Sequence, residues 1–167
     1  LIAMPGLEDP TFAKSVVYLC EHSERGAMGL IINKPGELSL KHLFDKVDLP
    51  LHREDLLQSN VLHGGPIQTE RGFVLHEPIW LSSAENSEAS KKPLDAEAAD
   101  QTEVASSIYA STLSVPGGLA MTTSKDVLEA LSNGSGPKRV LVTLGYASWG
   151  EGQLESEIGE NSWLTVE

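Results

Sequence analysis

The chain has 167 residues, and its 24 acidic and 12 basic side chains give a formal net charge of −12. An acidic surface repels phosphate groups, so this charge argues against binding to nucleic acid or to an anionic membrane. The length suits one domain, the single cysteine excludes an intrachain disulfide, and no apolar run approaches the roughly 18 residues that a membrane helix needs.

The first strong pattern along the chain is a β-hairpin over residues 15–35. Two apolar runs, Val16–Cys20 and Ala27–Ile32, flank a polar segment that ends in Arg25-Gly26. This arrangement is expected for a hairpin that is buried on both faces. Cys20 lies in the first run, where a lone cysteine is usually a small core residue.

Helix signals follow at two places. Ser39 can cap a helix whose apolar residues fall on one stripe, at Leu40, Leu43, Phe44 and Val47. Thr123 or Ser124 is expected to cap another, with Asp126 in its first turn and Asn133-Gly134 at its end. Further strands are expected at residues 61–63, 73–81, 107–115, 119–122, 139–144 and 163–166, and a short helix near 153–158. Strands outnumber helices and come largely in adjacent pairs, which indicates an α+β protein.

The composition changes sharply at Ser82. The segment that follows is rich in Ser, Ala and Glu and contains almost no large apolar residue. Such a segment cannot bury enough surface to offset the entropy lost on ordering. We therefore predict a mobile acidic insertion loop at residues 84–106.

Several blocks along nearly the whole chain resemble the YqgE/AlgH family of bacterial proteins. They are CEHSERGAMGLIINKP at 20–35, HGGP at 63–66, RGFVLH at 71–76, TTSKDVLEAL at 122–131 and LGYASWGEGQLESEI at 144–158. The resemblance implies one cytoplasmic domain over residues 1–167, in which a bent mixed sheet forms a partial barrel with a few short helices packed on it. It implies no reaction, and the chain departs from the family pattern at the 84–106 insertion.

Potential acid–base and metal-binding groups gather at the end of the hairpin. In an unbroken strand Cys20 and His22 share one face and Glu21 lies on the other, which disfavours a common site. His63 and His76 could in principle join His22 on a metal ion, but no His-x-His or His-x-x-x-His spacing supports this. The sequence therefore predicts neither a metal site nor a cofactor.

The glycine-rich segments Gly64–Pro66 and Gly145–Gly152 are the favoured ligand sites, because backbone amides in such loops can hold an anion. Neither segment has the spacing of a nucleotide-binding loop or of a nucleophile elbow. Aromatic residues are scarce, so most of the tryptophans are expected in the core; the alternative for Trp149, on the second of these loops, is a surface position where it contacts a partner. The candidate ligand- or partner-binding residues are Glu21, His22, Asn33, Lys34, Gly64, Gly65, Arg71, His76 and Trp149.

These observations predict a non-enzymatic binding or regulatory protein whose partner is another protein or a small ligand. The first alternative is a small-molecule hydrolase, or another enzyme, that uses His and Glu groups near the hairpin end and the glycine loops. The second is a transcriptional regulator. The charge of −12 and the lack of a helix-turn-helix with a basic second helix count against that class.

Overall fold

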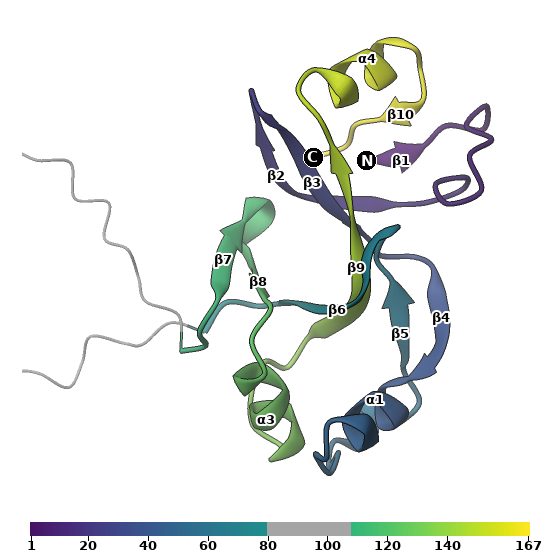
Figure 1. Ribbon diagram of the computed structural model, residues 1–167. Coiled ribbons are helices and arrows are strands. Elements are labelled where there is room, and N and C mark those ends of the chain that lie inside the picture. The colour runs from purple at the N-terminus through teal and green to yellow at the C-terminus, as the bar shows by residue number, and fades with distance from the viewer. Residues whose placement is uncertain (80–107) are drawn as a thin grey trace, which may run out of the picture.

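The computed structural model describes residues 1–79 and 108–167 (Figure 1). The predicted insertion at 84–106 and the predicted end of a strand at Trp80-Leu81 lie outside these residues. The described elements are β1 (Ile2–Ala3), β2 (Val17–Ser23), β3 (Gly26–Ile31), β4 (Pro35–Ser39), α1 (Leu40–Lys46), α2 (Glu54–Leu57), β5 (Asn60–His63), β6 (Ile67–His76), β7 (Thr112–Val115), the 3-10 turn η1 (Pro116–Gly118), β8 (Leu119–Thr122), α3 (Asp126–Ser132), β9 (Val140–Trp149), α4 (Gln153–Gly159) and β10 (Trp163–Leu164).

The main sheet has the strand order β2-β3-β9-β6-β8-β7 and curls into a nearly closed barrel. These neighbours are antiparallel, while β5 pairs with β9 in parallel and with β4 in antiparallel orientation. The two end strands approach each other without pairing, and the Tyr18 hydroxyl on β2 donates a hydrogen bond to the carbonyl oxygen of Pro116. The predicted α+β class with a barrel-like mixed sheet is thereby confirmed.

Three hydrophobic clusters fill the interior, and β9 contributes to each of them. The helix cluster lies between the sheet and helices α1 and α3 and includes Phe44, Val74, Val127 and Val142. The barrel cluster lies inside the curled sheet and includes Leu30, Phe73, Leu75 and Met121. The terminal cluster joins the β2–β3 hairpin to α4 and β10 and includes Ile31, Ala147, Trp149 and Trp163. Figure 1 shows β9 running from the level of α3 to that of α4.

The helix ends show where local sequence decides the structure. Ser39 caps α1 as predicted, because its hydroxyl accepts a hydrogen bond from the backbone N–H of His42 at 3.2 Å. The prediction for α3 is wrong by one or two residues, since its N-cap is Lys125, which makes no side-chain cap. Asn133 and Gly134 end this helix as predicted, with Gly134 in the left-handed region. None of the helices in the described parts of the chain has the length and apolar character that crossing a membrane requires.

Strand β9 is longer than the apolar run predicts. The sequence indicates a strand at 139–144 and a glycine loop from Gly145, but the strand continues to Trp149. Gly145 has a φ of 76°, and a Cβ atom there would lie 2.4 Å from the carbonyl oxygen of Gly65. The glycine therefore bends the strand where another backbone passes, rather than ending it.

Candidate functional site

A concave surface surrounds Arg71, with one hollow beside the barrel cluster and a second beside the helix cluster. Two pockets of 490 and 310 Å³ meet there and share Arg71 and Thr123. We call the combined surface the Arg71 groove. The first pocket is lined by Met28, Gln68, Arg71, Phe73, Ser111, Thr112, Leu113, Met121, Thr123 and Tyr146. The second is lined by Leu43, Val47, Glu70, Arg71, Gly72, Val74, Thr122, Thr123, Ser124, Lys125, Leu128, Val142 and Leu144.

A break in strand pairing places Arg71 in this groove. β6 pairs with β9 at Ile67 and again from Gly72 onward, with a register shift between them. Gln68 begins this irregular stretch with a φ of 47°. The intervening residues are free of the ladder, as is usual at a bulge, and they are exposed. The Arg71 Nη1 donates a hydrogen bond to Oε1 of Gln68 at 3.3 Å.

The Arg71 guanidinium combines a charge with an aromatic surface. Its Cζ lies 5.6 Å from the centroid of the Phe73 ring, within the range of a cation–π contact. The ring of Tyr146 stands edge-on to that of Phe73, with the centroids 5.5 Å apart. No carboxylate of the described residues lies within 4 Å of Arg71. The groove thus offers an accessible cation beside aromatic and thioether groups, and ligand sites commonly combine apolar walls with a few polar groups.

The hairpin end does not form the predicted arrangement. A β-bulge between Leu19 and Glu21 leaves Cys20 without a partner in the ladder. Beyond the bulge Glu21 stands opposite Met28 of the barrel cluster, whereas His22 stands opposite Ala27 of the terminal cluster. The expectation that Cys20 and His22 share a face is therefore wrong, because one extra residue reverses the alternation.

His22 and Glu155 meet on the surface instead. Nε2 of His22 lies 2.5 Å from Oε1 of Glu155, and both side chains are about half exposed, at 47% and 52%. This hydrogen bond lowers the pKa of Glu155. Cys20 is buried, and burial raises the pKa of its thiol to about 12, so the thiolate that nucleophilic chemistry needs is disfavoured. The pair and the thiol lie outside the Arg71 groove.

Asn33 and Lys34 hold the chain that precedes the hairpin. The Asn33 side chain accepts a hydrogen bond from the N–H of Val16 at 2.8 Å and donates one to the carbonyl oxygen of Lys14 at 2.9 Å. Lys34 Nζ donates to the carbonyl oxygen of Thr11 at 2.5 Å. These contacts account for both residues without a ligand, and neither residue lines the Arg71 groove.

Gly64 and Gly65 are buried against the backbone of β9. A Cβ on Gly64 would lie 2.3 Å from the carbonyl oxygen of Gly145, and one on Gly65 would lie 2.1 Å from the carbonyl carbon of Tyr146. The N–H of Gly64 already donates to the carbonyl oxygen of Leu144 at 2.8 Å. Gly64, Gly65 and Gly145 therefore fit against each other, and of the two glycine segments the exposed turn Gly150–Gly152 between β9 and α4 is the part that forms an open loop.

His76 is buried and hydrogen-bonded on both ring nitrogens. Nδ1 donates to the carbonyl oxygen of Glu77 at 2.7 Å, and Nε2 lies 2.7 Å from Oγ1 of Thr122. The Thr122 hydroxyl in turn lies 2.7 Å from that of Thr112. Buried polar networks of this kind fix neighbouring strands, here β6, β8 and β7. In the parts of the chain that the structure describes, three or more His, Cys, Asp or Glu side chains do not gather as a metal site requires.

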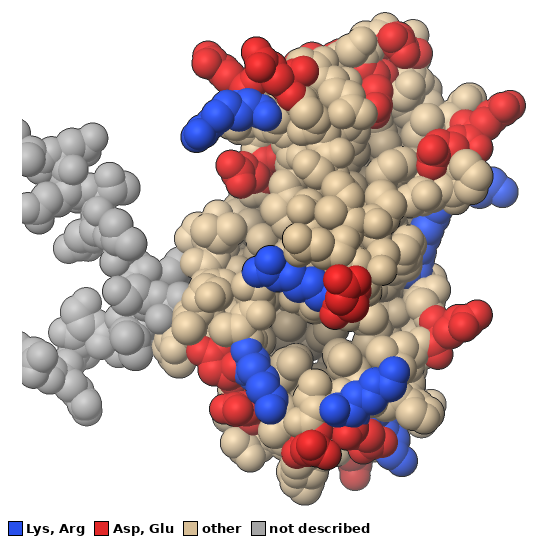
Figure 2. Space-filling view, in the orientation of Figure 1, with Lys and Arg blue, Asp and Glu red and all other residues tan. Residues whose placement is uncertain are grey.

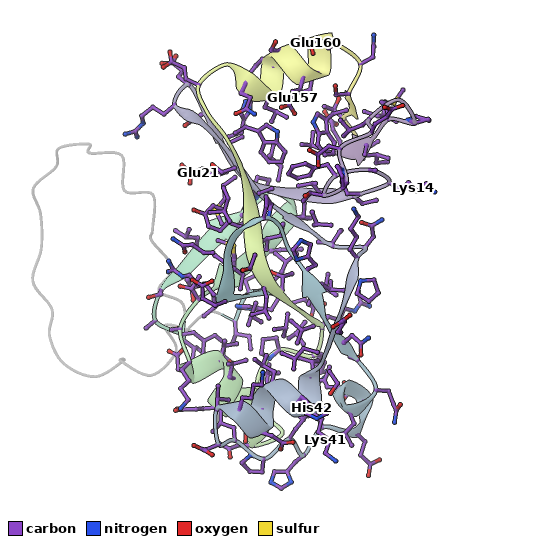
Figure 3. All side chains as sticks on the ribbon, turned by 45° about the vertical axis from the view of Figure 1, so that its right-hand side comes forward. Lys14, Glu21, Lys41, His42, Glu157 and Glu160 are labelled. Atoms are coloured by element: carbon purple, nitrogen blue, oxygen red, sulfur yellow. The ribbon has the colours of Figure 1, made fainter. Side chains whose placement is uncertain are left out.

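Trp149 is not on a surface loop, because it ends β9 and is only 3% exposed. Its Nε1 donates to Oε2 of Glu157 at 3.0 Å, and Nε1 of Trp163 donates to the same oxygen at 2.8 Å. Figure 3 shows Glu157 on the side of α4 that faces the body of the molecule, with Glu160 farther out. This carboxylate joins α4 to β9 and β10.

Of the nine predicted residues, Arg71 alone lines the Arg71 groove. The other lining residues come from β6 itself, from β3, β7, β8 and β9, from the helices and from the loops beside β7 and β8, and each is unremarkable in its own segment. Only the curl of the sheet brings them together, so no local motif marks them. The shift from apolar alternation to the polar run QTER before Gly72 is the signal that could have located the bulge.

Comparisons with known proteins agree with this fold. A family model described as AlgH-like matches residues 1–167. A UPF0301 protein from Paracidovorax citrulli is 70% identical to this chain, and the match covers 99% of this chain and 76% of that protein. A UPF0301 protein from Delftia acidovorans is 63% identical, and the match covers 99% of this chain and 74% of that protein. The solution structure of the AlgH protein from Pseudomonas aeruginosa is 42% identical, with a TM-score of 0.67 over 99% of this chain and 73% of that one. Protein DIP2367 from Corynebacterium diphtheriae is 20% identical and shares the fold. Its TM-score is 0.63, and the match covers 98% of this chain and 71% of that one.

Proposed function

This chain belongs to the AlgH-like family, and we propose that it is a non-enzymatic cytoplasmic binding protein with a regulatory role. Its ligand is an amphipathic carboxylate that enters the Arg71 groove. The observation that carries the proposal is the guanidinium of Arg71, which lies over the Phe73 ring without a carboxylate partner among the described residues.

The groove has the two components that such a ligand needs. Arg71 can hold a carboxylate with two parallel hydrogen bonds, which a lysine cannot do. The apolar part of the ligand would contact the adjacent Met28, Met121 and Tyr146, and sulfur atoms adapt well to ligands of different shapes. The overall charge of −12 would oppose an anionic ligand at long range, so recognition must be short-range and local.

The positions of the titratable side chains favour binding without turnover over catalysis. A nucleophile and a general base must lie within hydrogen-bond reach of each other and of the reacting atoms. Cys20 is buried with a raised pKa, and the His22–Glu155 pair does not line the groove. His76 is enclosed by its own hydrogen bonds to Glu77 and Thr122.

The experiment uses octanoate and octanol as probes, because they differ in the carboxylate and share an alkyl chain. Each is titrated into isotopically labelled protein while amide chemical shifts are recorded. Octanoate should move the resonances of groove residues such as Thr123 and Tyr146, and octanol should move them much less. Replacing Arg71→Gln should weaken octanoate binding about five- to tenfold, since a charge-assisted hydrogen bond at an exposed site is worth roughly 1–1.5 kcal/mol.

The control variant is Lys41→Gln, which removes one positive charge from α1, at the end of the molecule away from α4 (Figure 3). Lys41 does not line the groove, so its loss should leave octanoate binding nearly unchanged. Equal weakening by the two variants would mean that the net charge matters and Arg71 does not. Shifts that cluster away from the groove would place the ligand site elsewhere.

A further inference from the structure

The Arg71 groove consists of two hollows whose linings differ in chemistry. The barrel-side hollow, of 490 Å³, lies beside the barrel cluster, and the helix-side hollow, of 310 Å³, lies beside the helix cluster. Arg71 and Thr123 are the two residues that line both. A simple fatty acid bound at Arg71 would fill one hollow and leave the other to water.

The barrel-side hollow suits an aromatic group. The rings of Phe73 and Tyr146 line it, edge-on to each other with their centroids 5.5 Å apart. Met28 and Met121 add two thioether groups, and sulfur makes favourable contacts with aromatic rings. A further ring placed here would gain from both kinds of contact, beyond the gain from burying its apolar surface.

The helix-side hollow suits an aliphatic chain. Among the described residues, no aromatic or sulfur-containing side chain lines it. Glu70 and Lys125, the charged residues that line it besides Arg71, are exposed and can remain in water. Figure 2 shows this face of the molecule hollowed above the two helices at its base. The aliphatic walls come from α1 and its C-cap, α3, β6 and β9, and they are Leu43, Val47, Val74, Leu128, Val142 and Leu144.

Thr123 offers a polar contact where the two hollows meet. Its backbone N–H donates to the carbonyl oxygen of Ser111 at 3.2 Å, but its hydroxyl makes no hydrogen bond to another described residue. The side chain is half-buried and lines both hollows. Because a hydroxyl both donates and accepts, it can bond to an amide that links two apolar groups of one ligand.

We propose, building on the function proposed above, that the ligand of the Arg71 groove is an N-acyl aromatic amino acid. Its carboxylate binds Arg71, its aromatic side chain enters the barrel-side hollow and its acyl chain enters the helix-side hollow. These three groups diverge from one α-carbon in this class of molecule, as the two hollows diverge from Arg71. The amide that joins the acyl chain lies beside the Thr123 hydroxyl.

Three probes that share the carboxylate and the amide test this proposal. N-octanoyl-L-phenylalanine has both apolar groups, N-octanoylglycine lacks the ring, and N-acetyl-L-phenylalanine lacks the long acyl chain. Each is titrated into the isotopically labelled 167-residue chain while amide chemical shifts are recorded. The first should bind at least about tenfold more tightly than either of the others, because it buries a second apolar group. N-octanoylglycine should move the resonances of Leu128 and Val142, and N-acetyl-L-phenylalanine those of Met121 and Tyr146.

Two matched variants test which hollow takes which group. Val47→Asn places an amide in the helix-side hollow, and Leu113→Asn places one in the barrel-side hollow. Neither residue belongs to a hydrophobic cluster, and thermal melts verify that both variants are folded. Val47→Asn should weaken N-octanoylglycine about threefold and leave N-acetyl-L-phenylalanine nearly unchanged, whereas Leu113→Asn should do the reverse.

Two results would overturn the proposal. One is that N-octanoyl-L-phenylalanine binds no more tightly than the better of the other two probes. The other is that the two variants weaken the same probe equally. Octanoate that still binds through Arg71 in either case would leave the proposed function standing, whereas loss of all Arg71-dependent carboxylate binding would remove both.

Discussion

Glu157 provides the sharpest test of how the terminal cluster is held together. Replacing Glu157→Ala removes the oxygen that accepts hydrogen bonds from the indoles of Trp149 and Trp163. It also removes the partner of Gln153, whose Nε2 donates to Oε1 at 3.1 Å. Both indoles belong to nearly fully buried residues, at 3% and 4% exposure, so their N–H groups have little access to water once the carboxylate is gone.

The size of the effect follows from these bonds. A hydrogen bond to a charged group contributes about 1.5–3 kcal/mol, and the half-buried position of Glu157 will let some water replace the carboxylate. We therefore expect the free energy of unfolding to fall by about 3 kcal/mol, which lowers the Tm of a protein of this size by roughly 6–12 °C. Replacing Glu157→Gln keeps one carbonyl oxygen as an acceptor and should lose about half as much.

The assay is thermal unfolding followed by tryptophan fluorescence and far-UV circular dichroism. The control is Glu160→Ala on the same helix, where the exposed carboxylate has only a 3.5 Å contact from the Ser156 hydroxyl. Its Tm should remain close to that of the unmodified chain. If Glu157→Ala and Glu160→Ala melted at the same temperature, the shared carboxylate would not hold the two indoles.

Three further outcomes follow from the structure. Gly65→Ala should prevent folding or lower the Tm strongly, because the added Cβ would lie 2.1 Å from the backbone of Tyr146. Gly159 has open space around it, so Gly159→Ala should be tolerated. Expression levels and thermal melts compare the two variants. Burial raises the pKa of Asp126, but hydrogen bonds from Ser124, Ala110 and Val127 outweigh it and lower the pKa overall. The stability that these bonds provide is present above the ordinary carboxyl pKa and is lost as the pH falls through the lowered pKa of Asp126. Thermal melts from pH 7 to pH 3 should therefore show a steeper fall in Tm for the unmodified chain than for Asp126→Asn. Cys20, whose pKa is raised to about 12, should react with a thiol reagent at pH 8 only in denaturant, and rapid labelling of the folded protein would contradict its burial.

The sequence predicted those features of the fold that depend on local chemistry. The hairpin, the Ser39 cap and the stop at Asn133-Gly134 each rest on a few neighbouring residues, and the structure contains all three. The β-bulge after Leu19 was not predictable in this way. Its effect on Cys20 and His22 depends on the register with β3, which no single strand specifies.

The candidate site was harder to predict because glycine has two opposite uses. Gly64, Gly65 and Gly145 indicated open loops that could bind an anion, yet each allows one backbone to approach another. A sequence alone does not distinguish a glycine that exposes the backbone from one that buries it. Arg71 was among the predicted binding residues, and the groove that it lines includes Leu144 and Tyr146, the residues on either side of Gly145.

The participation of β9 in all three hydrophobic clusters has a consequence for how the molecule unfolds. Val142, Tyr146 and Trp149 connect the helix, barrel and terminal clusters through a single strand. An opening that releases β9 therefore exposes all three clusters together, and the described parts of the chain should behave as one cooperative unit. Amide hydrogens along Val140–Trp149 should exchange with solvent at a similar, slow rate, although Figure 1 shows the strand running through much of the length of the protein.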